Sequence, residues 1–191
     1  MIAAVVLAAG ASTRFGSPKQ RLLLQPVLER VRASSSLDEV VVVLGAHDVD
    51  TDARTVRCPQ WERGPGASLR CGLSALGDAA DAAVVVLADG PELAPQAIDR
   101  VVAAWRAGGS EILAATYDGQ RSHPVLVARS RWSDVPDEGL RAMVATPVPC
   151  DDLRPPGDVD YPEDLARGKR GFPQEPRLPR GKPGFPREPP S

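Results

Sequence analysis

The chain has 191 residues, of which 42% are hydrophobic and 25% charged, a composition near the globular average and sufficient for one buried core. Its formal net charge is −2, and because six cations and two acids follow residue 168, that tail carries +4 and residues 1–168 carry −6. An acidic body argues against nucleic acid as a partner and requires fixed cations or a metal wherever the protein handles phosphate.

Three cysteines, Cys58, Cys71 and Cys150, are odd in number, far apart and without a CxxC pair. This pattern predicts neither a disulfide framework nor a zinc site, and it favours a reducing, cytoplasmic location. The apolar start MIAAVVLAAG lacks a basic leader and runs directly into a polar loop, so we expect a buried strand and no signal peptide. No run reaches the ~18 apolar residues of a membrane span.

In chain order, short aliphatic runs without polar alternation predict strands that are covered on both faces, at Ile2–Ala8, Glu39–Leu44 and Ala83–Ala88. Segments with helix-like spacing lie between and after them, at Pro26–Ala33, Ser68–Leu76 and Pro95–Ala107. Two more strands are expected at Glu111–Thr116 and Pro124–Ala128, and a short closing helix at Pro162–Leu165. Alternating strands and helices predict a three-layer α/β domain over residues 1–167 with a mostly parallel sheet.

The last part of the chain, residues 168–191, is rich in Pro and Arg and contains most of a repeat, RGKxGFPxEP, with a period of thirteen residues. With almost no aliphatic side chains it cannot build a core, and we expect a disordered or polyproline-like extension. Docking into a groove on a partner protein is the alternative.

A loop of small residues that ends in two cations follows the first strand and reads LAAGASTRFGSPK from Leu7 to Lys19. Gly10 and Gly16 can adopt conformations closed to other residues, and Ser12 and the loop N–H groups can donate to phosphate oxygens. Arg14 and Lys19 supply positive charge. We interpret the loop as a triphosphate cradle whose nucleotide-binding residues are Leu7, Ala8, Ala9, Gly10, Ser12, Arg14 and Lys19. A dinucleotide-binding fold would use a similar turn, but GxGxxG and GxxxxGK[ST] are both absent.

These residues resemble the signature LAAGxSxRxGxxK of the nucleotidyltransferases of molybdenum-cofactor biosynthesis. Later landmarks of that family recur in order over about residues 1–166: Trp61-x-x-Gly64 with Ser68-Leu69, Leu87-Ala88-Asp89-Gly90-Pro91, Arg121-Ser122-His123-Pro124-Val125, and the segment from Asp158 to Leu165. The LAAG opening, the DxP turn and the HPV segment resemble the CTP:molybdopterin cytidylyltransferase branch, since the guanylyl branch tends to open with LAGG. The resemblance implies a Rossmann-like, GT-A-type nucleotide-diphospho transferase fold, CTP and molybdopterin as substrates, and Mg²⁺ as cofactor.

Asp89 ends a predicted apolar strand, so its carboxylate is expected at the carboxyl edge of the sheet, where open α/β folds bind ligands. Mg²⁺ prefers one or two carboxylates together with phosphate oxygens and water, which makes Asp89 a candidate metal ligand and catalytic residue. An Asp that only caps the next turn is the alternative. Asp158 and Asp160 alternate along an extended segment and share one face. We take Asp158 as the second metal ligand; Asp160 could take that role instead, or cap the closing helix.

Arg121 and His123 precede an apolar strand and are candidate contacts for the phosphate or pterin of the acceptor, although a structural role for His123 is an alternative. Gly64 and Ser68 precede a helix, and in the family this segment lies near the base or ribose; a plain N-cap at Ser68 is equally natural. His47 has no motif around it and is expected on a surface loop.

The chain departs from the family after Lys19, where Leu22-Leu23-Leu24-Gln25 runs directly into Pro26. By comparison with the family, several residues of a strand and turn are absent, which predicts a shortened helix. Another departure is Tyr161, where the family usually has Thr. Two further hypotheses therefore stay open: a catalytically poor nucleotide-binding protein that delivers cofactor to a molybdenum enzyme, and a transferase that uses GTP or another acceptor, such as a sugar phosphate.

Overall fold

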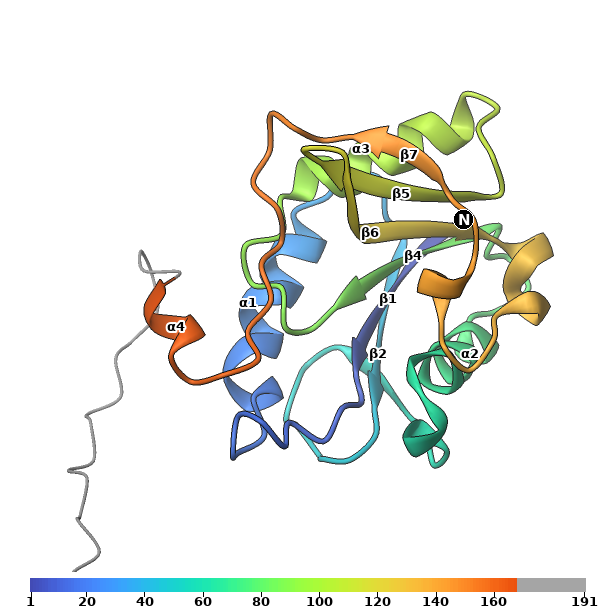
Figure 1. Ribbon diagram of the computed structural model, residues 1–191. Helices are drawn as coiled ribbons and strands as arrows, with labels where there is room; N and C mark the ends of the chain where they lie inside the picture. Colours follow the sequence, from blue (N-terminus) through green and yellow to red (C-terminus); the bar gives the residue numbers. More distant parts are fainter. Residues whose placement is uncertain (168–191) are drawn as a thin grey trace, which may run out of the picture.

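The protein, seen here in a computed structural model that describes residues 1–167, is built around one seven-stranded sheet (Figure 1). The strand order is β3-β2-β1-β4-β6-β5-β7. The strands are β1 Ile2–Ala8, β2 Glu39–Leu44, β3 Arg54–Arg57, β4 Ala82–Leu87, β5 Ile112–Tyr117, β6 Gln120–Ala128 and β7 Thr146–Pro149. All neighbouring pairs are parallel except those of β6, which runs antiparallel to β4 and β5.

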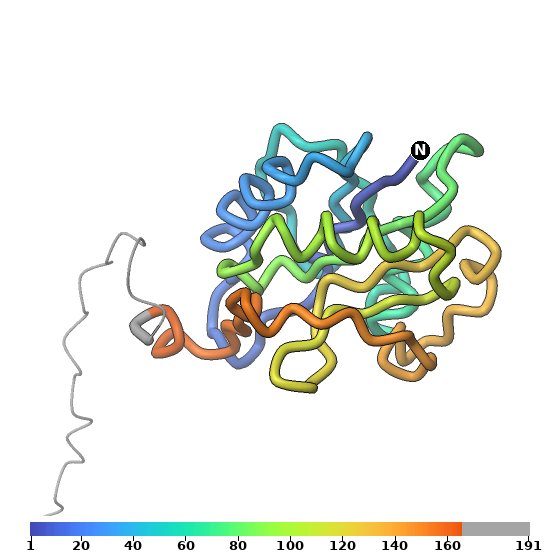
Figure 2. Tube along the Cα trace, turned by 90° about the horizontal axis from the view of Figure 1, so that it is seen from above, coloured from blue at the N-terminus to red at the C-terminus, as the bar shows by residue number. Residues whose placement is uncertain are grey.

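Helices cover both faces of the sheet and make the expected three layers. Helices α1 (Gln20–Arg32) and α3 (Pro95–Arg106) pack on one face, against the alternate strand residues that include Ala4 and Val6. Helix α2 (Pro65–Ala75) packs on the other face, against Ala3 and Val5 (Figures 1 and 2). The remaining helical segments are α4 Asp164–Arg167 and the 3-10 turns η1 Trp61–Arg63, η2 Arg129–Asp134 and η3 Leu140–Ala142. The predicted α/β fold is confirmed.

The central strands are buried on both faces, as their uninterrupted aliphatic sequences predict. Strands β1 and β2 have the predicted bounds, and β4 begins and ends one residue earlier than expected. The edge strands β3 and β7 were not predicted, because each is only four residues long and has three exposed residues. Their sequences therefore lack the apolar run that marks a buried strand.

The predicted start of the first helix at Pro26 is wrong, because α1 begins at Gln20 and contains Pro26 in its second turn. Proline lacks an N–H and so removes one helical hydrogen bond, a loss that this helix offsets by burying a continuous apolar face. That face is formed by Leu23, Leu24, Val27, Leu28 and Val31. The helix is thus thirteen residues long, and it begins directly after Lys19.

The expectation of no disulfide is also wrong, because Cys58 and Cys71 are joined. Cys58 follows β3 and Cys71 lies in α2, and the packing of α2 on the sheet brings their Cα atoms to 5.6 Å. Separation along the chain is therefore no guide to distance here. Cys150 is a free, buried thiol.

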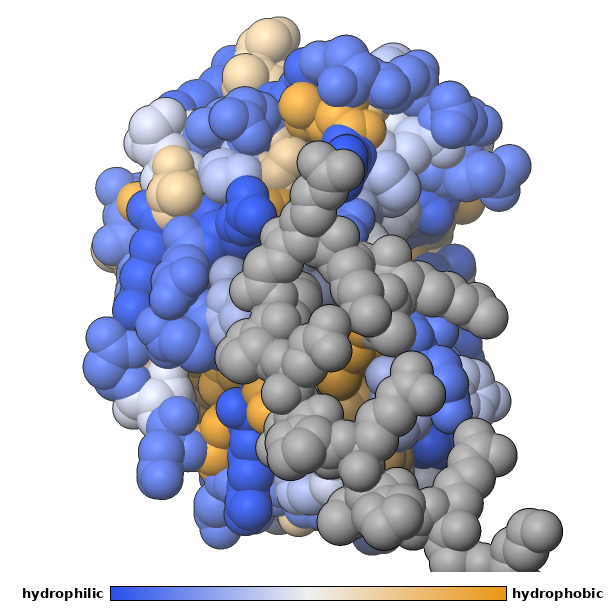
Figure 3. Space-filling model, turned by 90° about the vertical axis from the view of Figure 1, so that its left-hand side faces the viewer, coloured by the Kyte–Doolittle hydropathy of each residue, from blue (hydrophilic) through white to orange (hydrophobic). Residues whose placement is uncertain are grey.

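The described surface on the face drawn in Figure 3 is mainly hydrophilic, with small apolar areas among the polar ones. Within residues 1–167 no helix combines the length and the apolarity that crossing a membrane requires. The predicted Pro- and Arg-rich extension, residues 168–191, lies outside the described residues.

Candidate active site

The loop after β1 is a compact turn at the carboxyl edge of the sheet. The N–H groups of Phe15 and Gly16 both donate to the carbonyl of Ser12, at 3.0 and 3.2 Å. Ser12 and Gly16 have φ values of +54° and +78°, in the left-handed region. Gly16 therefore uses the freedom expected of a glycine, whereas Gly10 does not. A Cβ built at Gly10 meets no atom within 4 Å, which leaves open space above the loop.

The side chain of Gln20, the first residue of α1, holds this loop from inside. Its amide nitrogen donates to the Gly10 carbonyl at 2.7 Å, and its amide oxygen accepts from the Ser12 hydroxyl at 2.9 Å. Ser12 Oγ in turn accepts from the Lys19 backbone N–H at 3.3 Å. Gln20 is only 4% exposed, so these hydrogen bonds are shielded from water and fix the loop relative to the helix.

A ring nitrogen of His47 contacts the Ala11 carbonyl at 2.9 Å, on the other side of the loop. His47 lies on a loop, as expected, but it is partly buried and contacts the β1 loop rather than having no role there. The loop between β2 and β3 carries it to the β1 loop, where the N–H of Ala46 also donates to the Ala9 carbonyl. Two neighbouring segments thus hold the β1 loop in place.

The ammonium group of Lys19 lies at the centre of the site. Its Nζ donates to Asp89 Oδ2 at 3.0 Å, to Asp160 Oδ1 at 3.2 Å and to the Val159 carbonyl at 2.7 Å. Burial opposes its charge, but the carboxylates of Asp89 and Asp160 outweigh that effect and raise the pKa of Lys19. The predicted triphosphate cation and the predicted metal ligand therefore meet in one cluster.

Asp160 binds both predicted cations of the loop. Its second oxygen accepts from Arg14 Nη1 at 2.8 Å, and the hydrogen bond from Lys19 is the main cause that lowers the pKa of Asp160. The side chain that accepts from the backbone at the start of α4 is Asp164, which receives the N–H groups of Asp160 and Tyr161. The alternative of Asp160 as the helix cap therefore does not hold in the structure, and Tyr161 leaves this turn intact.

Three carboxylates, those of Asp89, Asp158 and Asp160, have one oxygen each within 4.8 Å of the others. Among residues 1–165, whose side chains the structure describes, none donates a hydrogen bond to the Asp158 carboxylate. Loss of hydration and the neighbouring charges of Asp89 and Asp160 raise its pKa. Closely spaced carboxylate oxygens with an unused member suit a hard divalent cation.

Backbone hydrogen bonds attach the segment that carries Asp158 and Asp160 to the turn after β4. The N–H of Val159 donates to the Asp89 carbonyl at 3.1 Å, and the N–H of Glu92 donates to the Pro156 carbonyl at 3.0 Å. A Cβ at Gly90 would lie 3.0 Å from the Pro156 side chain, so the close approach requires glycine. Figure 1 shows this segment running from β7 past α1 to α4.

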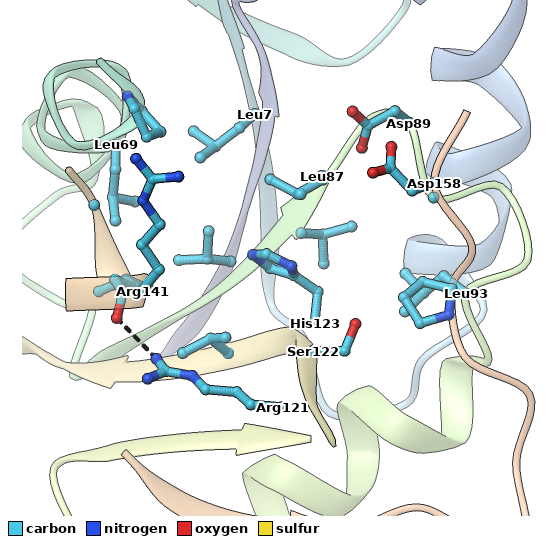
Figure 4. A pocket seen from close by; sticks show the side chains of 18 of the residues that line it. Leu7, Leu69, Leu87, Asp89, Leu93, Arg121, Ser122, His123, Arg141 and Asp158 are labelled. Carbon is cyan, nitrogen blue, oxygen red and sulfur yellow. Dashed lines mark hydrogen bonds between the residues drawn. The ribbon is translucent and has the colours of Figure 1, made fainter. Parts of the chain in front are cut away.

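A cavity of about 410 Å³ opens beside the carboxylates, a volume within the usual range of small-molecule sites (Figure 4). Leu7 and Leu87 lie on its sheet side, and Pro65 and Leu69 of α2 line it as well. The polar and charged side chains that line it are Asp89, Arg121, Ser122, His123, Glu138, Arg141 and Asp158.

Gly64 is the N-cap of α2 and has φ +133°, and a Cβ there would lie 2.5 Å from the Asp137 carbonyl. Ser68 lies inside the helix, is 4% exposed and does not cap it, so the alternative of an N-cap at Ser68 is wrong. The helix begins earlier because Pro65 is a favourable first residue.

Arg121 and His123, on β6, both line the cavity. Arg121 donates to the carbonyls of Leu140 and Met143 at 2.8 and 2.7 Å, which ties β6 to the turn η3. Burial lowers the pKa of His123 to about 4, more than the nearby charge of Asp89 raises it. The imidazole is therefore neutral near pH 7.

The structure thus brings most of the predicted site residues to one edge of the sheet. Arg14, Lys19, Asp89 and Asp158 gather at the loop, while Leu7, Arg121 and His123 line the adjoining cavity. Ala8 and Ala9 are buried beneath the loop. Gln20 and Arg141 were not predicted from the sequence. Gln20 could have been recognised as a polar residue on the buried face of α1, but only if the helix had been predicted to begin at Gln20.

Comparisons with known proteins agree with this geometry. Residues 4–146 match the model of the MobA-like NTP transferase domain family. A sequence search among curated proteins found no match.

Among solved structures, the homologue of Mycobacterium tuberculosis Rv0371c from Mycobacterium sp. strain JC1 is 26% identical with a TM-score of 0.72, over 87% of this chain and 93% of that one. Rv0371c from Mycobacterium tuberculosis H37Rv is 28% identical with a TM-score of 0.71, over 87% and 97%. A manganese complex of Rv0371c has also been solved and matches at 26% identity with a TM-score of 0.67, over 87% and 96%.

Molybdopterin-guanine dinucleotide biosynthesis protein A from Archaeoglobus fulgidus shares the fold, at 18% identity and a TM-score of 0.63 over 86% of this chain and 95% of that one. The family match covers most of the chain and includes the loop, Lys19 and Asp89. The protein is therefore a nucleotidyltransferase and belongs to the MobA-like NTP transferase domain family.

Proposed function

We propose that the protein transfers CMP from CTP to the terminal phosphate of molybdopterin and releases pyrophosphate, with Mg²⁺ as its cofactor. The observation that carries the proposal is the position of the Lys19–Asp89 pair, between the small-residue loop and the cavity. A triphosphate on the loop and an acceptor in the cavity would meet at this pair.

Lys19 and Arg14 are the groups that bind the triphosphate. Both now donate to Asp160, and phosphate oxygens can replace that carboxylate as hydrogen-bond acceptors. The open space above Gly10 leaves room for the phosphates next to the loop N–H groups. Gln20 keeps the loop in shape, so little ordering is needed when the nucleotide binds.

Asp89 and Asp158 are the residues that would hold Mg²⁺, and Asp160 lies next to them. Bound there, the ion would neutralise charge that develops on the phosphate oxygens. The fit rests on the spacing of the carboxylate oxygens and on the Asp158 carboxylate, which accepts no hydrogen bond from residues 1–165. Manganese in the complex of Rv0371c is consistent with a divalent ion in this family.

In the proposed reaction, an oxygen of the acceptor's terminal phosphate attacks the α-phosphorus of CTP. A new P–O bond joins the two phosphates, the bond from the α-phosphorus to the bridging oxygen breaks, and pyrophosphate leaves with that electron pair. The attacking phosphate is already an anion, so no general base is required. Nucleotidyl transfer of this kind depends on positioning and charge neutralisation, which Lys19 and Arg14 supply.

Arg121 and His123 are the proposed contacts for the acceptor in the cavity wall. Because the imidazole of His123 is neutral near pH 7, it can offer a hydrogen bond but no charge. Gly64 caps α2 and Ser68 is buried in its first turn, next to cavity residues Pro65 and Leu69; this end of the helix is proposed to lie near the base or ribose.

The choice of CTP rests on Ala9, the position at which the guanylyl branch has Gly. Ala9 is 6% exposed and packs in the core beneath the loop, so its methyl group helps to set the position of the loop backbone. We expect CTP to bind in preference to GTP. Calorimetry with Mg²⁺ tests this expectation, and GTP that binds tenfold more tightly, by ~1.4 kcal/mol, would contradict it.

The decisive assay is pyrophosphate release from each of the four NTPs, with and without molybdopterin. Release from CTP only when molybdopterin is present supports the proposed reaction. Release that needs a sugar 1-phosphate instead would assign another acceptor, and nucleotide binding without release from any pair would indicate a catalytically poor binding protein.

A further inference from the structure

Two arginines line the cavity, and they differ in what they bind. The guanidinium of Arg121 donates to the carbonyls of Leu140 and Met143. Arg141 also lines the cavity, but its side chain forms no hydrogen bond and no ion pair with the described side chains and backbone of residues 1–165. His123 is neutral near pH 7, and two nitrogens of Arg121 are already engaged by carbonyls, so Arg141 is the cation of the cavity wall with the most donors available to a ligand.

The segment that carries Arg141 is firmly held, although its side chain is exposed. The carboxylate of Asp137 pairs with both Arg63 and Arg70, and the Asp137 carbonyl accepts from the N–H of Gly66 at 2.9 Å. These contacts join the segment to α2 and η1.

Gly139, two residues before Arg141, has φ +77°, and its N–H donates to the Pro136 carbonyl at 3.0 Å. The two hydrogen bonds from Arg121 hold the far end of the same turn. The backbone that presents Arg141 is therefore fixed from both the α2 side and the β6 side before any ligand binds.

Figure 4 shows how Arg141 lies relative to the carboxylates. Its guanidinium is beside Leu69, on the opposite side of the cavity from Asp89 and Asp158, and His123 lies between the two sides. A ligand that spans the cavity with its phosphate at the carboxylates would have its other end near Arg141.

We propose that Arg141 is an acceptor-binding residue, whose guanidinium binds oxygen atoms of the acceptor at the end remote from the reacting phosphate. The chemical class is a phosphorylated small molecule that carries an anionic or carbonyl oxygen at its far end. Planar guanidinium groups bind such oxygens through two parallel N–H donors. Besides its proposed contact with the acceptor, Arg121 holds the turn η3 and so also positions Arg141. The inference rests on the proposed function for the identity of the acceptor.

The test measures steady-state pyrophosphate release by the full chain and its Arg141→Met and Arg141→Lys variants. We expect Arg141→Met to raise the KM for molybdopterin at least tenfold, with kcat changed less than threefold and the KM for CTP within twofold. Arg141→Lys should recover part of the loss, because it restores charge without the planar fork. Arg106→Met removes the same charge from the exposed end of α3 and should change none of these values.

An unchanged acceptor KM in Arg141→Met would overturn the inference while leaving the proposed reaction intact. If the wild-type protein releases no pyrophosphate with molybdopterin, the proposed reaction fails. Binding of inorganic phosphate then tests separately whether Arg141 binds an anionic ligand. Its Nε–H signal in the NMR spectrum, identified by its loss in Arg141→Lys, should then shift saturably with phosphate while that of Arg106 does not. Equal responses of the two arginines, or none, would overturn the inference.

Discussion

Lys19 Nζ lies 3.0 Å from Asp89 Oδ2, so a cation expected to bind the triphosphate forms an ion pair with a residue expected to bind the metal. The side chain of Lys19 is 12% exposed and that of Asp89 25%, which limits screening by water. In the protein without ligands, Lys19 therefore supplies positive charge where a divalent ion would supply it.

We predict that Lys19→Met will strengthen metal binding and weaken nucleotide binding. Without the ammonium group, the carboxylates of Asp89 and Asp160 lose a competing cation, and Mn²⁺ should bind the nucleotide-free protein roughly tenfold more tightly, by ~1.4 kcal/mol. CTP should bind at least tenfold more weakly. Calorimetry with each ligand measures both changes. Arg21→Met, which removes an exposed charge of α1, is the control, and parallel weakening of both ligands would contradict the prediction.

Asp89→Asn should lower kcat at least a hundredfold at ordinary Mg²⁺ concentration, equivalent to about 2.7 kcal/mol of transition-state stabilisation. The change removes charge but almost no volume, so circular dichroism and the melting temperature should change little. Asp50→Asn, at an exposed site outside the cluster, provides the matched control. Substantial residual turnover in Asp89→Asn would remove Asp89 from the metal site.

Gln20→Ala should raise the KM for CTP, because the loop loses the hydrogen bonds to Gly10 and Ser12. Two lost hydrogen bonds correspond to about 1–3 kcal/mol, or roughly a five- to hundredfold rise in KM if the loop loosens. Gln25→Ala, at an exposed position of the same helix, should leave KM unchanged. A Gln20→Ala protein that melts lower but binds CTP normally would assign Gln20 to stability alone.

His123 should stay neutral throughout the range from pH 5 to pH 8, because burial lowers its pKa to about 4. In the unfolded chain its pKa is about 6.5, so the unfolded state takes up a proton first as the pH falls. The free energy of unfolding should therefore decrease between about pH 6.5 and pH 4, by at most about 3 kcal/mol from this residue. Above about pH 6.5 the contribution of His123 to the free energy of unfolding should not change with pH.

NMR titration of the imidazole signals measures this pKa directly. The chain has only two histidines, so a His47→Gln variant assigns the remaining signals to His123. A titration midpoint near 6.5 for His123 would show that the cavity is hydrated enough to stabilise the imidazolium, and the prediction would be wrong.

Local sequence patterns were sufficient for the α/β fold, for β1 and β2, and for the loop from Leu7 to Lys19. Buried strands need unbroken aliphatic runs, and a backbone that turns tightly at a ligand needs small residues, so these features are readable from neighbours in the chain. The start of α1 could not be predicted in this way. Proline usually marks the first turn of a helix, which placed the start at Pro26, but packing of the apolar face from Leu23 onward against the sheet makes the helix begin earlier, at Gln20.

Only the tertiary structure decided which distant groups meet. The Lys19–Asp160 contact spans 141 residues, Cys58 finds Cys71 through the packing of α2, and Arg141 reaches the cavity because Arg121 and the contacts of Asp137 hold its turn. Such contacts depend on how strands and helices are arranged in space, and no spacing along the chain encodes them. The sequence alone therefore determines the types of chemical group available, and the fold determines which of them act together.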